Sequence, residues 1–322
     1  MEGASMHEDS MMTLGDVTVR TASVPTVDTS FYNLSPAQAA FFKTQTGIDD
    51  DEDLKRHILE VQAKAYKVAP YPCIHVFNFL RLNLSNFPVY EHILQLGRER
   101  PDAVLLDIGC CFGVDARKAA ADGFPAKNVI ASDIVSEFLQ LSHELFKTTP
   151  ASYPGCLLPG DVFDPEFLSI AAPSDDISPA PAIDLSSLKT LNSLHGRISA
   201  INAITFFHLF NEEKQLHVAR ALAGLLSAQP GSVICGFDTG SREKGTVTAN
   251  LSGAEYQTFS HSPETWSSMW DGEVFEKGTV KVETEFMEIP VFDVRHLMMR
   301  WSVTVDKYNS GLQPRTAINL IF

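Results

Sequence analysis

The sequence predicts an α/β fold in which a mostly parallel sheet follows a helical N-terminal region. From Val104 onward, short apolar runs alternate with segments of helical periodicity, which is the pattern of βαβ units in a parallel sheet. Near the C-terminus, two strand-like segments, 297–305 and 316–322, flank Asn309-Ser310-Gly311, a turn sequence typical of a hairpin. The sheet is therefore expected to close with an antiparallel C-terminal hairpin.

Residues 31–100 carry helical patterns and no strand pattern, which predicts an N-terminal helical cap. The preceding residues, 1–30, are rich in Ser, Thr, Met and Asp without periodicity, and we expect a disordered tail there. Helices are predicted after Ser35-Pro36, from Asp53 to about Val68 and from Val89 to Arg98.

Residues 101–322 are expected to form one α/β domain. Strands are predicted at 104–109, 128–133, 156–158, 198–204 and 232–237, and helices around 116–121, around 138–146 and from Asn211 onward. A Pro/Ser/Asp-rich stretch at 172–187 is too long for a simple connector and is expected to be a flexible loop. Residues 241–290 are interpreted as a lid insertion before the final hairpin.

Composition excludes several classes of protein. The net charge of -15 opposes binding to a nucleic-acid backbone, and no cluster of Lys or Arg offsets it. Five cysteines without a CxxC pair, and an N-terminus without signal-peptide features, favour a reducing, cytoplasmic location. No apolar run approaches the ~20 residues of a membrane span. The histidines show no metal-ligand spacing, so no metal is expected.

The first predicted strand ends in the turn Asp107-Ile108-Gly109-Cys110-Cys111-Phe112-Gly113. In an open parallel sheet, ligands bind beyond the carboxyl ends of the strands. Gly109 permits a tight turn there, and Gly113 permits close packing at the start of the next helix. The N-terminus of that helix suits a carboxylate group. A turn of this kind is also common as a purely structural element.

Two further acids follow at successive strand ends. Asp133 ends the second strand, where an acid can accept hydrogen bonds from ribose hydroxyls, although it could also cap the next helix. Asp161 ends the third strand, beside Val162, and is expected to meet an adenine amino group. Three acids at three successive strand ends indicate a nucleoside pocket. Cys110, Ile134, Asn202 and Tyr71 are expected to contact the same cofactor.

The first turn discriminates between two cofactors. A dinucleotide fingerprint requires G-x-G-x-x-G, whereas here Cys111 takes the place of the middle glycine and the spacing is G-x-x-x-G. The turn therefore favours S-adenosylmethionine (SAM), with S-adenosylhomocysteine as product, over NAD. The adjacent Cys110 and Cys111 lack metal or redox partners and are interpreted as packing residues.

The fourth strand leads into Phe206-Phe207-His208, where a transferred group is expected to lie. His208 is a candidate general base, or a donor that orients an oxygen nucleophile, although a lone His among aromatics is often a core residue. His261, Trp266 and Trp270 would add aromatic walls from the lid. The two tryptophans, four positions apart, could equally form one buried helix face.

Several segments together resemble the fungal secondary-metabolite methyltransferases, especially those that esterify prenylated polyketide acids in meroterpenoid pathways. They are the segment from Tyr66 to Ile74, the GCCFG turn at 109–113, the strand 129–133, the segment 206–210 and the segment 261–266. The resemblance covers roughly residues 31–295. It implies SAM, a Rossmann-like class I sheet of seven strands whose last hairpin is antiparallel, and a helical cap that places Tyr66, Tyr71 and Pro72 over the cofactor.

The sequence thus predicts a SAM-dependent methyltransferase acting on an oxygen, carboxylate or phenol, of a small-molecule secondary metabolite. His208, Tyr66, Phe207, His261, Trp266 and Trp270 are the residues expected to face that substrate. Methylation of nitrogen or carbon, an NAD(P)-dependent oxidoreductase, a catalytically silent SAM-binding module and a methyltransferase of nucleic acid or protein remain as alternatives.

Overall fold

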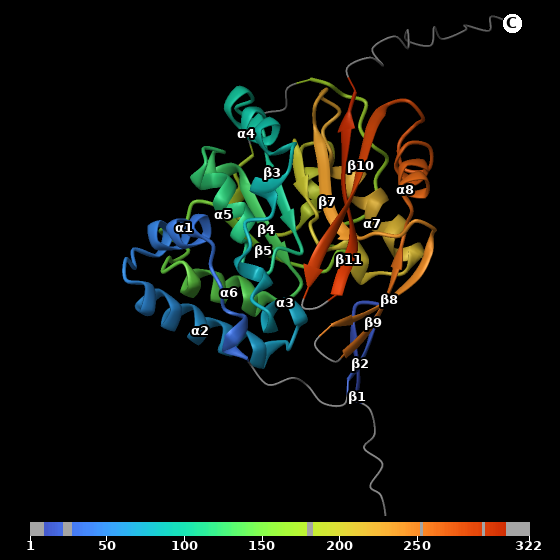
Figure 1. Cartoon of the computed structure of the whole chain (residues 1–322). Helices are drawn as coiled ribbons and strands as arrows, with labels where there is room; N and C mark the ends of the chain where they lie inside the picture. Colours follow the sequence, from blue (N-terminus) through green and yellow to red (C-terminus); the bar gives the residue numbers. More distant parts are fainter. Residues whose placement is uncertain (1–9, 22–27, 179–182, 252–253, 292–293, 307–322) are drawn as a thin grey trace, which may run out of the picture.

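A computed structural model describes residues 10–21, 28–178, 183–251, 254–291 and 294–306. A seven-stranded sheet forms its centre, in the order β10-β11-β7-β6-β3-β4-β5 (Figure 1). The strands are β3 (Leu105–Ile108), β4 (Val129–Asp133), β5 (Cys156–Pro159), β6 (Ala200–Asn202), β7 (Val233–Thr239), β10 (Val280–Val291) and β11 (Val294–Val305). Only β11 runs against its neighbours in this sheet. The predicted Rossmann-like, mostly parallel sheet is confirmed.

The antiparallel hairpin of the central sheet is present, and its strands are β10 and β11. β11 was predicted, and it pairs with β7 and with β10, whereas the predicted partner 316–322 lies outside the described residues. The segment of β10 alternates apolar and charged residues, as in Val280-Lys281-Val282-Glu283, which is a strand pattern. The interpretation of 241–290 as a lid is therefore wrong for 280–290, which belong to the central sheet.

Helices cover both faces of this sheet, because successive residues of its strands point to opposite sides. Leu106 of β3 packs in a core with α7 (Glu212–Leu225) and α8 (Pro263–Trp270). Leu105 packs in a second core with α4 (Tyr90–Glu99) and α5 (Val114–Ala121). A further helix, α6 (Ser136–Leu145), follows β4.

The expected helices of the N-terminal cap are present. They are α1 (Pro36–Thr46), α2 (Asp51–Val68) and the short α3 (Pro72–His75). A capping box between Ser35 and Gln38 begins α1. The cap packs on α6, and the rings of Phe42 and Phe146 stack with centroids 5.7 Å apart. These helices lie at the lower left of Figure 1, next to α6.

The expectation of a disordered tail is wrong for residues 10–21. They form a hairpin of β1 (Ser10–Leu14) and β2 (Val17–Thr21). This hairpin adds to β8 (Gly245–Leu251) and β9 (Ala254–Ser260) in a four-stranded sheet of order β1-β2-β9-β8. A hairpin alone is marginal, so its formation depends on pairing with β9, far away in the sequence. The small sheet lies below β7, β10 and β11 in Figure 1.

The 172–187 stretch contains one short helical turn, Leu185–Ser187, whose Leu185 is buried, and residues 179–182 lie outside the described part. Its flexibility stays a prediction. Among the residues that the structure describes, we find no helix with the length and apolarity that crossing a bilayer requires.

Candidate functional site

The turn after β3 has the tight backbone that the sequence predicts. Gly109 and Gly113 both have φ of +65°, and Cys111 between them has φ of +55°. A Cβ at Gly109 would lie 2.5 Å from the ring of Phe206, and one at Gly113 would lie 3.0 Å from Cβ of Ala131. Both glycines are therefore required. Cys111 holds a conformation that a side chain rarely adopts, and such strain often marks functional sites.

Asp107 lies beneath this turn, not at its surface. It is almost completely buried, and its two carboxyl oxygens accept from Nδ2 of Asn202, at 2.8 Å, and from the backbone N–H of Ala116, at 3.2 Å. Burial and the nearby Asp115 raise its pKa well above the ordinary value. Asp107 and Asn202 thus support the turn and the start of α5. Oδ1 of Asn202 is buried without a hydrogen-bond partner.

Asp133 lies at the end of β4 and faces the turn. Its Oδ2 accepts from the N–H of Cys111 at 2.7 Å, and its Oδ1 accepts from the N–H of Val135 at 2.9 Å. Both the capping contact and the contact to the turn are therefore present. Each carboxylate oxygen keeps a second lone pair, which can accept from a ribose hydroxyl. Burial raises the pKa of Asp133 to about 6, despite its backbone hydrogen bonds.

Ile134 beside it is 62% exposed, an unusual state for a large apolar side chain. An adenine ring is a group that would cover it. Asp161 lies two residues beyond the end of β5, its Oδ1 accepts from the N–H of Phe163 at 2.9 Å, and Val162 is buried. The strand ends thus bring Asp133, Ile134 and Asp161 to one edge of the sheet, and this donor set fits a nucleoside.

The cap reaches this edge through α3. Tyr71 packs edge-on against Phe138 of α6, with ring centroids 5.8 Å apart, and burial together with the charge of Asp133 raises its pKa. Cys73 and Cys111 pack against the same hydrophobic core, so the segment that follows Tyr71 lies near the turn. Tyr66 is half-buried and lies beside His75, with ring centroids 5.8 Å apart. The tyrosines therefore lie where the cap meets the predicted cofactor site.

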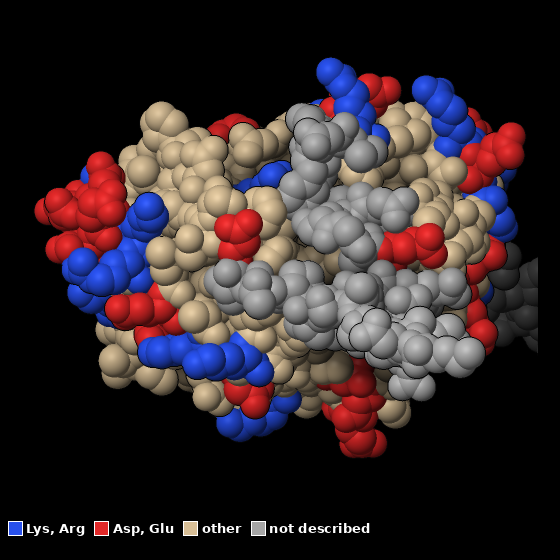
Figure 2. All heavy atoms as spheres, turned by 60° about the horizontal axis from the view of Figure 1, so that its bottom comes forward, with Lys and Arg blue, Asp and Glu red and all other residues tan. Residues whose placement is uncertain are grey.

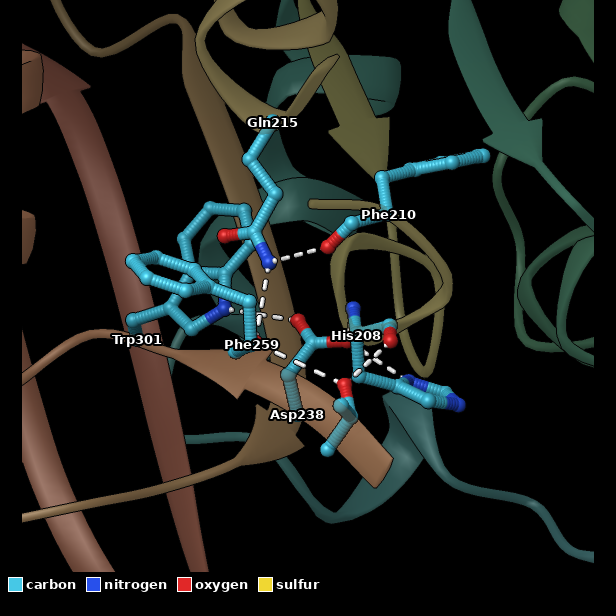
Figure 3. Close-up of polar contacts among 7 residues, drawn as sticks. His208, Phe210, Gln215, Asp238, Phe259 and Trp301 are labelled. Carbon is cyan, nitrogen blue, oxygen red and sulfur yellow. Dashed lines mark hydrogen bonds and ion pairs between the residues drawn. The ribbon is translucent and has the colours of Figure 1, made fainter. Parts of the chain in front are cut away.

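His208 lies on the short turn Phe207–Leu209 that follows β6, which we call the histidine turn. Its Nδ1 is 3.1 Å from Oδ1 of Asp238, which also accepts from the backbone N–H of His208 at 3.2 Å. Oδ2 of Asp238 accepts from Nε1 of Trp301 at 3.2 Å. Figure 3 shows Asp238 between the His208 ring and the indole, with the outer ring nitrogen of His208 directed away from this contact.

The residues before His208 connect the histidine turn with the turn at 109–113, which we call the cofactor turn because SAM is predicted to bind there. The ring of Phe206 covers Gly109, as the 2.5 Å approach shows. Thr205 has a φ of +52°, rare for a β-branched residue, and its N–H donates to the carbonyl of Phe237 at 2.8 Å. The strained backbone at Thr205 thus brings Phe206 onto the cofactor turn. The His208 side chain that follows is 26% exposed.

The assignment of Phe207, Trp266 and Trp270 to the substrate site stays a prediction, and Phe207 and Trp266 line a small pocket together with His208. The three aromatic side chains are 1%, 2% and 0% exposed and form an aromatic cluster with Trp301. The two tryptophans of α8 are the buried helix face that their spacing also allowed. His261 is buried as well, and burial lowers its pKa to about 4. Its ring borders a pocket of 210 Å³ between α7 and α8.

Asp238 is the residue that sequence reasoning missed. Its signal was available, because Asp238 follows the apolar run of β7 near its carboxyl end, as Asp133 does in β4. Trp301 was missed because its strand, β11, reaches Asp238 only through antiparallel pairing with β7.

Comparison with known proteins identifies the relatives of this chain. Residues 28–80 match the family model described as the meroterpenoid methyltransferase N-terminal domain. Methyltransferase ausD of Penicillium brasilianum is 32% identical over 234 residues, which cover 73% of this chain and 75% of that protein. O-methyltransferase phiE of a fungal species is 31% identical over 232 residues, 71% of this chain and 68% of that protein.

Among solved structures, the S-adenosylmethionine dependent methyltransferase from Mesorhizobium loti matches with 12% identity and a TM-score of 0.41, over 69% of this chain and 100% of that one. The level of identity to ausD, over most of both chains, decides the family. The chain belongs to the fungal secondary-metabolite methyltransferases of the meroterpenoid type.

Proposed function

We propose that this methyltransferase transfers the methyl group to an oxygen of a small-molecule secondary metabolite, and that His208 acts on that oxygen. The observation that carries this proposal is the contact between Nδ1 of His208, on the turn that follows β6, and Asp238. Phe206, two residues before His208, covers Gly109 in the turn after β3. The printed name of phiE, an O-methyltransferase, supports the choice of oxygen.

The hydrogen bonds of Asp238 indicate which His208 nitrogen is free to act. The carboxylate accepts from two obligate donors, the indole N–H of Trp301 and the backbone N–H of His208. Since Asp238 acts as an acceptor at both oxygens, Nδ1 of His208 is best assigned as a third donor. In the neutral ring, Nε2 then has no proton and can accept one from a substrate hydroxyl.

Asp133, Ile134, Asp161 and Tyr71 are the residues that we propose to hold SAM. When bound, SAM would supply a methyl group on a sulfonium sulfur, so that an oxygen can bond to the methyl carbon while the carbon–sulfur bond breaks and S-adenosylhomocysteine leaves. The protein contributes orientation and a closed site. A carboxylate, with a pKa near ~4, is already ionised at neutral pH, whereas a phenol, with a pKa near ~10, gains from a base. The identity of the acceptor therefore decides how much His208 contributes.

The surface also favours a small acceptor. Figure 2 shows the lower face of Figure 1, where acidic and basic side chains are interspersed over the described residues. A nucleic-acid substrate requires a continuous basic surface, and the net charge of -15 opposes it.

The test uses 4-amino-2-hydroxybenzoic acid, which offers a carboxylate, a phenol, an amine and ring carbons in one molecule. The full chain is incubated with SAM labelled in the methyl group, and the position of the label is determined by NMR. We expect a methyl ester or an aryl ether. Label on nitrogen or on ring carbon alone would contradict oxygen transfer.

A further inference from the structure

The histidine turn and the residue after it are fixed at three consecutive carbonyls, each by a donor from a different part of the chain. The hydroxyl of Thr258, on β9, donates to the carbonyl of His208. The N–H of Asp16, in the turn of the β1–β2 hairpin, donates to the carbonyl of Leu209 at 2.7 Å. Nε2 of Gln215 donates to the carbonyl of Phe210 at 2.9 Å (Figure 3). The backbone that carries His208 is thus held from outside its own segment.

Asp16 binds the segment after the histidine turn with its side chain as well as with its backbone. Its Oδ2 accepts from the N–H of Asn211, the residue that caps α7, at 3.0 Å. Its Oδ1 accepts from Nζ of Lys214 at 2.7 Å, as part of an ion pair. These two contacts, and its N–H to Leu209, tie the hairpin to both ends of the segment between the histidine turn and α7.

Gly15 makes the approach of the hairpin possible. Its φ is +62°, and a Cβ there would lie 2.4 Å from the carbonyl oxygen of Leu209. Only glycine therefore permits the N–H of Asp16 to reach that oxygen. The same hairpin pairs through β2 with β9, the strand that carries Thr258, so one small sheet supplies two of the three donors.

We propose that the Gly15-Asp16 turn is a positioning element for His208: it holds the histidine turn so that the imidazole keeps its contact with Asp238. The hairpin precedes residues 28–80, which match the family model, and so lies outside that model. The proposal rests on the proposed role of His208. It makes Asp16 a positioning residue that acts through the backbone of the turn and does not touch substrate.

The experiment compares Asp16→Ala, Asp16→Asn and Gly15→Ala in the full chain. Two control variants match them. Asp184→Ala removes an exposed Asp that likewise accepts from a backbone N–H, at 2.9 Å from Ser186. Gly47→Ala introduces the same strain at a φ of +70° where no atom lies within 4 Å. Turnover of 4-amino-2-hydroxybenzoic acid is measured together with the ¹⁵N NMR signals of the His208 ring, assigned with His208→Gln.

We expect Asp16→Ala and Gly15→Ala to lower kcat by about tenfold to a hundredfold, with the KM for SAM within about twofold of wild type. The ring-nitrogen shifts of His208 should move from the Nδ1–H tautomer toward a mixture. Asp16→Asn should recover most of kcat, because its amide oxygen still accepts from Asn211 and its backbone N–H is unchanged. Both controls should behave as wild type.

Wild-type His208 shifts and wild-type kcat in Asp16→Ala and Gly15→Ala would overturn the proposal. A loss of kcat that follows the loss of SAM affinity and of melting temperature, without rescue by Asp16→Asn, would also overturn it. The NMR measurement separates the two hypotheses: if no oxygen is methylated by wild type, the proposed function fails, while the His208 shifts still decide whether Asp16 positions the ring.

Discussion

Replacement of Asp238 by Asn is the most specific perturbation of the proposed chemistry. Asp238 accepts three N–H groups, two from His208 and one from Trp301, at 3.1 to 3.2 Å. An amide has one oxygen and one donor group, so at least one of these partners then faces a donor. If the NH₂ group faces Trp301, a buried indole N–H loses its acceptor. If it faces His208, the ring must place its proton on Nε2, away from the role of base.

The two effects have separate magnitudes. A buried donor left without a partner lowers the free energy of unfolding by about 1–3 kcal/mol, which denaturant unfolding measures. Loss of a positioned general base lowers the rate by about 10²- to 10⁴-fold. That second loss applies to a phenol but not to a carboxylate, because the carboxylate is already ionised. With 4-amino-2-hydroxybenzoic acid as acceptor, Asp238→Asn should therefore suppress the aryl ether far more than the methyl ester.

The assay is the ratio of ether to ester, determined by NMR at saturating SAM, with Asp184→Asn as the matched control. Equal loss of both products in a folded Asp238→Asn protein would refute the reasoning from the His208 tautomer. An unchanged ratio with unchanged rates would refute any role of Asp238 in the chemistry.

Three further predictions concern the cofactor turn and the buried acids. Burial raises the pKa of Asp133 to about 6, so its ionised form is lost below that pH, and the Kd for SAM should rise about tenfold between pH 7 and pH 5. Calorimetry of Asp133→Asn should show no such dependence. Gly109→Ala places a Cβ 2.5 Å from the ring of Phe206 and should weaken SAM binding at least about tenfold, whereas Gly123→Ala, with open space around it, should not. Burial raises the pKa of Asp115 to about 7, so its contribution to stability is present below pH ~4 and is lost as the pH rises through about 7. Relative to Asp115→Asn, the wild-type free energy of unfolding should then fall by up to about 3 kcal/mol between pH 5 and pH 7, as followed by urea unfolding, and a constant difference would contradict it.

The sheet and the cofactor turn could be predicted because their signals are local. Each apolar run lies within a few residues of the acid or the glycines that follow it. The strand order then brings Asp133 beside the turn without further information, since parallel neighbours end at one edge.

The errors arose where a distant partner decides the structure. Residues 17–20 alternate apolar and polar side chains, but this alternation is short, and the hairpin gains its partner only when β9 forms. The segment 280–291 has the alternation of a strand, but its place in the sheet depends on β11. The sequence alone does not separate a core role from a pocket role for Trp270 and Phe207, because aromatic side chains serve both, and their packing against Trp301 depends on the distant strand β11.

Calorimetric titration of the full chain with SAM and with S-adenosylhomocysteine, in wild type and in Asp133→Ala, tests the site itself. We predict that wild type binds both, and that Asp133→Ala, still folded by circular dichroism, binds SAM more weakly by at least about tenfold. A folded wild-type protein that binds neither ligand would contradict the assignment of the strand-end acids to the cofactor.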